Sequence, residues 1–291
     1  MDELTVLVTG PRGLLGAALM PVLSNAGFRV MPFDGDIMDR AAVQVAARNL
    51  GPSDWIIHAA AATDVNRCER DRVWCYAVNI HGTRNIRDAA VTRGARLIFI
   101  STASVFSGEE GGYCEQDLPY PKNFYNLTKY VGEVLAGEYV NATTLRLNLI
   151  GIHPKGSRGR NFFEWLLDTV RSDGDMRLFT DARINPLSNW TVADYVRDLI
   201  GRPAPPKVLH LASRDVLSKA DIGRFVVARF PAYNGKIMFT TSCDSLSTAA
   251  HRPKEMWLNA EAAVRYFGAK PPTIESEIER IFSLLPPGGC P

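Results

Sequence analysis

Short apolar runs alternate with amphipathic stretches along the first half of the chain. Nearly continuous apolar runs, typical of strands buried on both faces, predict strands at residues 4–10, 28–34, 54–61, 96–106 and 138–151. Between them, apolar positions recur at helical spacing, which predicts helices at residues 13–27, 41–51, 73–94 and 124–139. Strands and helices that alternate in this way predict an α/β fold with a doubly wound parallel sheet.

The alternation loosens after residue 151. Residues 156–174 have the pattern of a loop and a helix outside the sheet, whereas residues 191–201 and 207–213 are typical of a helix and a strand that return to it. We therefore expect two domains, each made of two pieces. The sheet domain comprises residues 1–151 and 188–214, and a smaller, mainly C-terminal domain comprises residues 152–187 and 215–291.

Composition indicates an ordinary globular protein. Of the 291 residues, 46% are hydrophobic and 22% are charged, and no apolar run is long enough to span a bilayer. The chain begins directly with a predicted strand instead of a signal peptide, so we expect a cytoplasmic location and no membrane partner. The net charge of +2 is spread along the sequence, which argues against a nucleic-acid partner because phosphate backbones bind clustered basic faces.

The cysteines and histidines lack the spacing of metal ligands. The five cysteines are widely separated and form no paired CxxC motif: Cys68, Cys75, Cys114, Cys243 and Cys290. The five histidines show no ligand spacing either. We therefore expect reduced thiols that mainly pack, and no bound metal.

A glycine-rich turn joins the first predicted strand to the first predicted helix. Gly10 permits a tight turn, Gly13 lets the backbone approach a pyrophosphate, and Gly16 lets the helix pack closely on the strand. Leu14 and Leu15 follow at the helix start, where backbone N–H groups attract anions. The turn predicts a dinucleotide site in a Rossmann-type domain; the alternative is a plain turn with incidental glycines.

Charged residues near this turn give opposing indications of the cofactor. Asp34 ends the second predicted strand, where a carboxylate would bind the adenosine ribose and repel a 2'-phosphate, which favours NAD. Arg12 lies within the glycine turn and could bind that phosphate, which favours NADP. The balance favours NAD by a small margin. Asp36 and Ile37 follow at once, either beside the adenine or in a solvated acidic turn.

Tyr125 and Lys129 have the spacing of a proton donor and the cation that tunes it. A free tyrosine has a pKa of about 10, and a lysine one helical turn away stabilises the phenolate and lowers that pKa. The preceding strand carries two hydroxyls at its carboxyl end, Ser101 and Thr102. Ligands bind at that edge of parallel sheets, so these residues predict a catalytic site.

A second pair, Tyr266 and Lys270, has the same spacing. This tyrosine lies near the end of a predicted helix, Gly268 and two prolines follow it, and no hydroxyl-bearing strand precedes it. We interpret the second pair as a chance match.

These motifs together resemble a known enzyme family. The segments TGPRGLLG, ISTASVF and YNLTK, in that order and at these separations, are similar to those of extended short-chain dehydrogenases/reductases. More narrowly, AAAATDVNRCE, NIHGTRNI and YCEQDLPYPKNFYNLTKYVGE resemble the dTDP-dehydrorhamnose reductase group, and GRNFFEWLL and HRPKEMWLN resemble its substrate domain. That group reduces a keto group on a nucleotide-linked deoxysugar with NAD(P)H. The resemblance implies a sheet domain that binds NAD or NADP and a second domain that binds a nucleotide sugar.

The resemblance assigns catalytic roles to individual residues. Tyr125 would protonate the alkoxide that forms as hydride arrives, and Lys129 would bind the nicotinamide ribose and lower the pKa of that tyrosine. Thr102 would hydrogen-bond the carbonyl oxygen, with Ser101 beside it near the cofactor. Asn79 would support the backbone of the catalytic loop through its amide, and simple packing of its helix is the alternative.

The same resemblance places a small-residue segment around the cofactor. Ala59, Ala60 and Ala61 would line the pyrophosphate and ribose. Thr63 and Val65 would face the nicotinamide and the sugar.

The sequence departs from the family pattern where the sugar and base should lie. Ala103 and Ser104 replace an acidic and an aromatic residue, and Asn148 and Leu149 replace a tryptophan. Residues 183–196 lack the usual glycine and Pro-Thr motif. These changes leave the chemistry in place but do not identify the sugar.

Residues of the smaller domain could contact the nucleotide. Arg252, followed by Pro253, would clamp a diphosphate, because a guanidinium matches phosphate geometry; a surface arginine before a turn proline is the alternative. Asn161 would either cap the helix that it begins or contact the diphosphate. The aromatic residues of that helix are expected to pack in the core instead of stacking on a base: Phe162, Phe163 and Trp165.

The sequence therefore predicts an NAD(P)H-dependent reductase of a nucleotide-activated keto sugar. A sugar-nucleotide epimerase or dehydratase of the same superfamily is one alternative, and it would consume no cofactor. A regulatory subunit is another, because the beta subunit of methionine adenosyltransferase resembles this reductase group. A homodimer is the expected assembly, since dimers are common among soluble proteins.

Overall fold

The computed structural model, which describes residues 3–156, 160–241 and 250–285, is built around a six-stranded sheet. Its strands are β1 (Thr5–Thr9), β2 (Arg29–Phe33), β3 (Trp55–His58), β4 (Arg96–Ile100), β5 (Ala142–Leu147) and β10 (Val208–Leu211). They lie in the order β10-β5-β4-β3-β1-β2, and every neighbouring pair is parallel. The predicted doubly wound α/β fold is confirmed.

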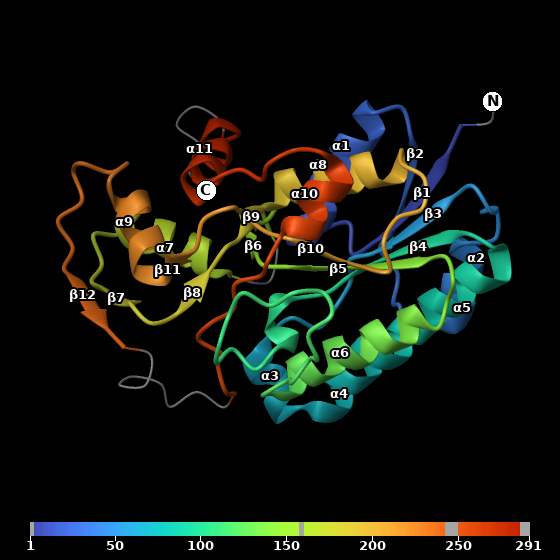
Figure 1. Ribbon diagram of the computed structural model, residues 1–291, viewed down its shortest axis with the longest axis horizontal. Helices are drawn as coiled ribbons and strands as arrows, with labels where there is room; N and C mark the ends of the chain where they lie inside the picture. Colours follow the sequence, from blue (N-terminus) through green and yellow to red (C-terminus); the bar gives the residue numbers. More distant parts are fainter. Residues whose placement is uncertain (1–2, 157–159, 242–249, 286–291) are drawn as a thin grey trace.

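Helices cover both faces of this sheet (Figure 1). One face carries α1 (Leu14–Asn25), α8 (Asn189–Ile200) and α10 (Glu261–Phe267), and the other carries α2 (Arg40–Ala46), α5 (Thr83–Arg93) and α6 (Phe124–Gly137). Alternate residues of β1 point to the two faces, because Val6 and Val8 pack with α1 and α8 whereas Leu7 packs with α2 and α5. Two buried apolar layers therefore enclose the sheet.

The predicted helix at residues 73–94 contains a widened turn. Its residues form α4 (Arg72–Tyr76), a π-helical segment (Ala77–Gly82) and α5, after the short helix α3 (Val65–Arg70). A π-helical turn holds an extra residue and often marks a functional position. Here the widened turn places Asn79 inside the molecule, where it is buried.

Two predicted strands end earlier than expected. β4 stops at Ile100, and a short 3-10 turn (Ala103–Val105) follows, in which Thr102 Oγ1 accepts the N–H of Ser104 at 3.1 Å. The other strand leaves the sheet after Leu147 and continues as β6 (Leu149–Ile150), which pairs with β9 (Leu187–Ser188). Both breaks lie at the carboxyl edge of the sheet, where ligands bind in folds of this type.

A second buried core lies on the side to which β6 leads (Figure 1). It contains α7 (Phe162–Arg171), α9 (Lys219–Val227) and α11 (Ile274–Ser283), with the short strands β7 (Met176–Phe179), β8 (Arg183–Ile184), β11 (Leu217–Ser218) and β12 (Ile237–Thr240). Residues of α10 fall within the predicted smaller domain, but Ala263 and Phe267 pack against the central sheet. The division of the chain into two domains of two pieces stays a prediction.

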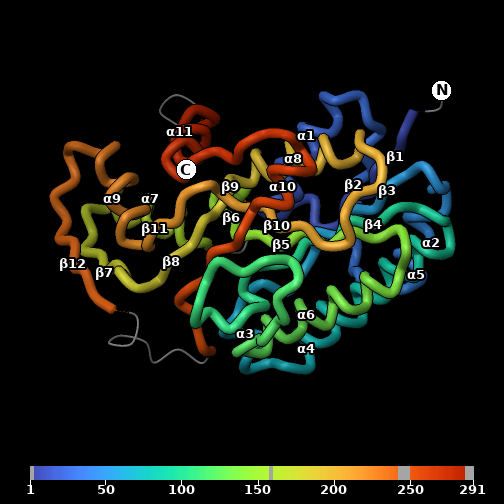
Figure 2. Tube along the Cα trace, viewed as in Figure 1, coloured from blue at the N-terminus to red at the C-terminus, as the bar shows by residue number. Residues whose placement is uncertain are grey.

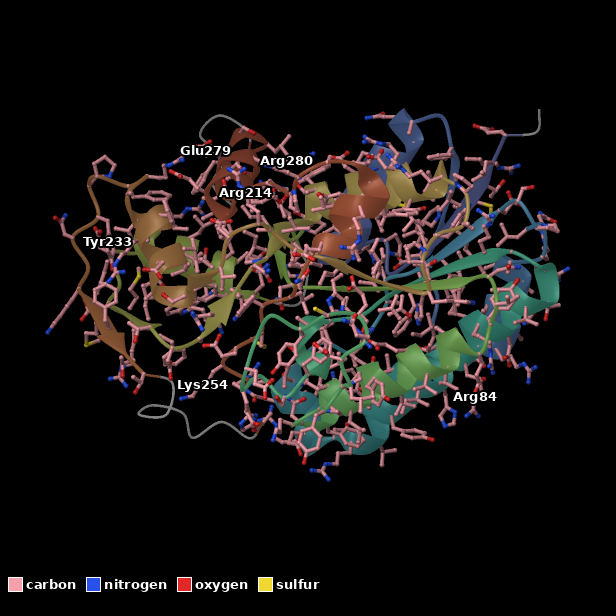
Figure 3. The ribbon with its side chains drawn as sticks, viewed as in Figure 1. Arg84, Arg214, Tyr233, Lys254, Glu279 and Arg280 are labelled. Carbon is pink, nitrogen blue, oxygen red and sulfur yellow. The ribbon has the colours of Figure 1, made fainter. Side chains whose placement is uncertain are left out.

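Two segments tie the second core to the sheet. The connecting segment, residues 250–260, runs beside the loop of residues 107–122 toward α10 (Figure 2), and its Trp257 carbonyl accepts the N–H of Gly112 at 2.9 Å. Arg280 of α11, which Figure 3 labels, reaches α8, where its Nη2 lies 2.6 Å from Asp194 Oδ2. Of the cysteines, Cys68, Cys75 and Cys114 are free thiols, whereas Cys243 and Cys290 lie outside the described residues.

Candidate active site

The turn after β1 has the close packing that a pyrophosphate site needs. Gly10 has a φ of 66°, in the left-handed region, and a Cβ atom added there would lie 2.9 Å from the Cα of Ala60. A Cβ atom at Gly16 would lie 2.0 Å from the carbonyl oxygen of Gly10, so a larger residue would force α1 away from the turn. Gly13 is the N-cap of α1, and no side chain caps this end. The first N–H groups of α1 are therefore left for an anion.

Arg12 and Asp34 form a bidentate ion pair beside this turn. Arg12 Nε lies 2.9 Å from Asp34 Oδ1, and Arg12 Nη2 lies 2.7 Å from Asp34 Oδ2. Both side chains are exposed, by 80% and 49% respectively, so a ligand can reach either of them. The two residues that give opposing indications of the cofactor thus neutralise each other.

Three neighbouring residues differ from their expected positions. The side chains of Leu15 and Ile37 are buried in the two cores of the sheet domain, so neither side chain can line an open cofactor site. For Leu15 only the backbone remains available, and the adenine contact expected of Ile37 stays a prediction that would involve its backbone. Asp36 Oδ1 accepts the N–H of Met38 at 2.8 Å, which supports the acidic-turn interpretation. Leu14 is half-buried, and its carbonyl accepts a hydrogen bond from Asn189.

A buried hydrogen-bond network supports the loop that follows β3. Asn79, which is 3% exposed, accepts the N–H of Ala62 at 2.7 Å and donates to the Ala62 carbonyl at 3.1 Å. It also donates to Thr128 Oγ1 at 2.9 Å, and Thr9 Oγ1 accepts the N–H of Ala60 at 3.1 Å. The Asn79 amide therefore holds the loop backbone from inside, and it does not face an open cofactor site.

Above this network, the loop itself remains accessible. Ala59, Ala60 and Ala61 are half-buried, and Thr63 is exposed. Val65 is half-buried at the start of α3.

Lys129 lies on α6, where it contacts the end of β4. The side chain is 5% exposed, its Nζ donates to the Ile100 carbonyl at 2.7 Å, and it lies 4.2 Å from the centroid of the Phe99 ring. Asn123 caps the start of α6 by accepting the N–H of Asn126 at 2.8 Å. The ammonium is therefore fixed next to the strand end that carries Thr102.

Tyr125 lies one turn before Lys129, at the start of the same helix. It packs against Ala62, Cys68 and Cys75. Within the part of the chain that the structure describes, its hydroxyl has no hydrogen-bond partner, so it is available to a ligand.

Burial shifts the pKa of both residues. It raises the pKa of Tyr125 above its ordinary value, with a further rise from Cys68 and Cys75. The expectation that Lys129 stabilises the Tyr125 phenolate stays a prediction. Burial lowers the pKa of Lys129 to about 8, although Glu133 and Cys75 act in the opposite direction. A phenol with a raised pKa stays protonated at neutral pH, as a proton donor must.

The segment after β4 divides between the site and the core. Thr102 is half-buried, and because its Oγ1 accepts the N–H of Ser104, its own proton remains free to donate to a carbonyl oxygen. Ser101 is buried and donates to Glu133, and Ala103 is buried in a small apolar cluster. The Ser101 and Ala103 side chains are thus engaged within the protein, and the cofactor contact expected of Ser101 and the substrate contact expected of Ala103 stay predictions.

Polar residues expected at the substrate hold the two cores together. Asn148 Nδ2 donates to the Met256 carbonyl at 2.6 Å, and Ser104 Oγ lies 3.2 Å from Met256 Sδ. Asn161 caps α7 in a capping box with Glu164, and its Nδ2 donates to the Gly151 carbonyl at 2.9 Å. Both amides are thus engaged within the protein, and the capping interpretation of Asn161 is the one that the structure supports.

Two cations lie near the same region, one on the connecting segment and one on α9 of the second core. Arg252 of the connecting segment lies 3.3 Å from Asn66 Oδ1 on α3, within the field of Asp64. Lys219, at the first turn of α9, is half-buried with its Nζ 5.4 Å from the Phe162 ring centroid. Burial and then the charge of Arg252 lower the pKa of Lys219 to about 8. No carboxylate of the described residues pairs with this ammonium, so an anionic ligand would stabilise it.

Sequence reasoning missed Lys219 and a buried ion pair behind Lys129, formed by Glu133 on α6 and Arg146 on β5. Lys219 is a lone lysine in the sequence LSKADI, and only the fold brings it near Arg252. Glu133 continues the spacing of Tyr125 and Lys129 by another four residues, which was a usable signal.

As expected, Phe163 is buried in the second core, while Phe162 and Trp165 are half-buried and stack at 6.1 Å between ring centroids.

Two general searches of residues 3–156, 160–241 and 250–285 were negative. No group of three or more His, Cys, Asp or Glu side chains there is arranged to hold a metal ion. No helix within these ranges has both the length and the apolar character needed to cross a membrane.

Comparison with known proteins places the chain in a family. Residues 4–285 match the family described as RmlD substrate binding domain. The chain is 29% identical over 217 residues to the spore coat polysaccharide biosynthesis protein SpsK of Bacillus subtilis, which covers 73% of this chain and 75% of that protein. It is 27% identical over 290 residues to the probable low-salt glycan biosynthesis reductase Agl14 of Haloferax volcanii, which covers 93% and 95% respectively.

A solved structure supports the same assignment. The dTDP-4-dehydrorhamnose reductase of Bacillus anthracis, determined in complex with NADP, superimposes with a TM-score of 0.87 at 26% identity, covering 97% of this chain and 99% of that one. The family match spans nearly the whole chain, and it agrees with the glycine turn, the strand end and the tyrosine-lysine pair described above. The protein therefore belongs to the RmlD substrate binding domain family, among the extended short-chain dehydrogenases/reductases that its motifs resemble.

Proposed function

We propose that this protein is an NAD(P)H-dependent reductase that converts the keto group of a nucleotide-activated deoxysugar to an alcohol, as dTDP-4-dehydrorhamnose reductase does. The observation that carries the proposal is the position of Tyr125 and Lys129 on one face of α6, with Lys129 bonded to the end of β4 beside Thr102. The family to which the chain belongs supports it.

The residues of the site suit such a reduction. Bound NAD(P)H supplies the hydride. Thr102 donates a hydrogen bond to the carbonyl oxygen, and Tyr125 transfers its phenolic proton to that oxygen as negative charge develops there. The ammonium of Lys129 stabilises the resulting phenolate until a solvent proton restores the phenol. The product is an alcohol, so protons and electrons balance.

The cofactor and the substrate are proposed to occupy opposite sides of this site. The uncapped start of α1, the glycine turn and the accessible loop of Ala59, Ala60 and Ala61 suit a dinucleotide pyrophosphate and ribose. Thr63 and Val65, which follow that loop, are proposed to face the nicotinamide and the sugar. Lys219 and Arg252 suit the diphosphate of the sugar nucleotide.

Between the two dinucleotides, we propose a small preference for NADH. Asp34 is positioned to accept the hydroxyls of an unphosphorylated ribose, and it already neutralises Arg12, the cation that a 2'-phosphate would need. The reductase of Bacillus anthracis was determined with NADP. NADPH is therefore the competing cofactor in every assay below.

The decisive assay follows the oxidation of NADH and of NADPH by the purified protein after addition of a dTDP-4-keto-6-deoxyhexose. Tyr125→Phe should lower kcat by at least about a hundredfold, because proton donation contributes roughly 10²–10⁴ to such rates. Tyr266→Phe is the matched control, since Tyr266 has the same spacing to a lysine but packs on α10 near the central core. It should retain the rate of the unaltered protein.

The same assay separates the alternatives. An epimerase would convert the sugar nucleotide without net consumption of NADH or NADPH. A regulatory subunit like that of methionine adenosyltransferase would bind the dinucleotide and turn over no sugar. Either result with the unaltered protein would refute the proposal, and so would full activity in Tyr125→Phe. A cytoplasmic location, a homodimeric assembly and the absence of a nucleic-acid partner stay predictions.

A further inference from the structure

A buried ion pair lies directly behind the proposed catalytic residues. Glu133 follows Lys129 by one turn of α6, so Tyr125, Lys129 and Glu133 share one face of the helix. Arg146 on β5 approaches the carboxylate with Nε at 3.1 Å from each oxygen and with Nη2 at 2.7 Å from Oε2. Both side chains are about 5% exposed. Transferring two charges from water into the protein interior costs several kcal/mol, and their mutual attraction must offset this cost. A buried ion pair is therefore weak evidence of a purely stabilising role.

Further contacts hold Arg146 in place. Its Nη1 lies 3.4 Å from the Glu115 carbonyl and 3.4 Å from Nε2 of His210, and its guanidinium lies 5.0 Å from the Phe106 ring centroid. His210 Nδ1 lies 3.0 Å from the Tyr113 carbonyl, so Nδ1 carries the proton and Nε2 accepts from Arg146. Burial, with the charge of Arg146, lowers the pKa of His210 to about 3, which keeps the ring neutral. The arginine is thus fixed from three sides.

Glu133 also reaches the strand end that carries Thr102. Ser101 Oγ donates to Glu133 Oε1, and Ser101 N donates to the Leu145 carbonyl at 2.7 Å. Through Ser101 the carboxylate joins α6 to β4 one residue before Thr102. The relative positions of the Thr102 and Tyr125 hydroxyls therefore depend on this contact.

The charge of Glu133 acts on Lys129. Burial lowers the pKa of that lysine to about 8, and Glu133 is the strongest influence that raises it, followed by Cys75. His58 faces Lys129 from β3, and because its own pKa is lowered to about 3 it carries no charge near neutrality. Tyr125 completes the titratable groups described around the ammonium. Substitutions of Glu133 or Arg146 leave Cys75, His58 and Tyr125 in place. They therefore isolate the effect of the ion pair on the pKa of Lys129.

We propose that Glu133, held by Arg146, is a positioning residue of the reaction: it keeps Lys129 protonated at neutral pH and fixes α6 against the strand end that carries Thr102. Its catalytic meaning rests on the proposed reductase function. Its effect on Lys129 does not, and can be measured in the protein without substrate.

The test is the titration of Lys129 in variants of the pair. NMR of protein labelled with ¹⁵N-lysine, with the Lys129 signal identified by its loss in Lys129→Met, gives the titration midpoint in the cofactor-free protein. Glu133→Gln keeps the side-chain shape but removes the negative charge and leaves Arg146, so the midpoint should fall by about one pH unit. Arg146→Gln leaves the carboxylate unpaired, so the midpoint should rise. The double variant should return toward the unaltered protein.

The pH dependence of kcat is a second readout, and it should shift in the same directions as the titration of Lys129. Because Lys129 must be protonated, the alkaline limb of the kcat profile should move to lower pH in Glu133→Gln and to higher pH in Arg146→Gln. Glu138→Gln is the matched control, because Glu138 forms an ion pair with Arg87 just past the end of α6, where Glu138 is 55% exposed. It should leave both the titration and the profile unchanged.

A purely structural role would give a different result. Both single variants would then unfold at lower temperature while Lys129 titrated at its original pH, or both would shift it in one direction, and either outcome would overturn the proposal. If Arg146→Gln does not fold, Glu133→Gln and the double variant still decide, since the proposal requires a fall in the first and its reversal in the second. If the unaltered protein reduces no keto sugar, the proposed function fails, but the NMR titration still tests the inference.

Discussion

At the scale of single residues, the Arg12–Asp34 pair links cofactor choice to one contact. Each side chain is satisfied by the other in the cofactor-free protein, at 2.7 and 2.9 Å. When NADH binds, Asp34 can accept hydrogen bonds from the ribose hydroxyls while Arg12 stays beside it. NADPH would require Arg12 to exchange its carboxylate partner for a phosphate, while the negative charge of Asp34 remains close by. The pair therefore favours NADH by less than a lone aspartate would.

Asp34→Asn should reverse this preference. The amide no longer repels a 2'-phosphate and no longer holds Arg12, so the KM for NADPH should fall about tenfold relative to the KM for NADH, equivalent to about one charged hydrogen bond. Steady-state assays with both cofactors give this ratio. Asp198→Asn is a suitable control, because Asp198 forms an exposed pair with Arg197 on α8. If the ratio of the two KM values is unchanged in Asp34→Asn, the Arg12–Asp34 pair does not discriminate between NADH and NADPH.

At the scale of helices and strands, sequence patterns predicted the parts that depend on local spacing. The glycine turn, the sheet strands and the helix with Tyr125 and Lys129 follow from periodicity and short motifs. The widened turn at Asn79 was not predictable, because its partners are the Ala62 backbone and Thr128, far along the chain. The partner of Asn148 was not predictable for the same reason, since the carbonyl to which it donates belongs to Met256. The substrate contact expected of Asn148 stays a prediction.

Replacing Gly16 or Gly137 with alanine should change the stability of the protein in opposite directions. A methyl group at Gly16 would meet the Gly10 carbonyl oxygen at 2.0 Å, so Gly16→Ala should push α1 from the turn, destabilise the protein by about 1–3 kcal/mol and weaken cofactor binding. Gly137 ends α6 with no atom within 4 Å of its added Cβ, so Gly137→Ala should stabilise the protein by about 0.5–1 kcal/mol. Urea unfolding and dinucleotide titration measure both effects. Destabilisation by Gly137→Ala, or none by Gly16→Ala, would contradict this account of the packing.

At the scale of the whole molecule, two buried neutral histidines connect separate strands. His58 lies between the hydroxyls of Thr9, at 2.9 Å, and Thr83, at 3.1 Å. Thr83 Oγ1 donates its only proton to the Asn79 carbonyl, so it accepts from Nε2–H of His58, and His58 Nδ1 accepts from the hydroxyl of Thr9. A chain of hydrogen bonds thus joins β1, β3 and α5 beneath the cofactor loop. His210 joins β10 to the loop after β4 in the same neutral state, so both rings depend on remaining uncharged.

Acid should therefore destabilise the whole protein before its carboxylates titrate. Burial lowers the pKa of both His58 and His210 to about 3, whereas an unfolded histidine titrates at about 6.5. Between these values the unfolded chain binds more protons than the folded one, so the free energy of unfolding falls as pH falls from about 6.5 toward 3. From pH 7 to pH 5 each histidine should contribute a loss of about 2 kcal/mol, measurable by urea unfolding at the two pH values.

Variants identify the source of this loss. His58→Gln and His210→Gln should each remove about half of the difference between pH 7 and pH 5, whatever their stability at pH 7, because glutamine does not titrate. His81→Gln is the control, since His81 is exposed on the π-helical segment and should leave the difference unchanged. Equal stability of the unaltered protein at the two pH values would mean that the folded state accepts protons on these rings. The hydrogen-bond chain beneath the cofactor loop would then have to rearrange, because a protonated His58 could no longer accept from Thr9.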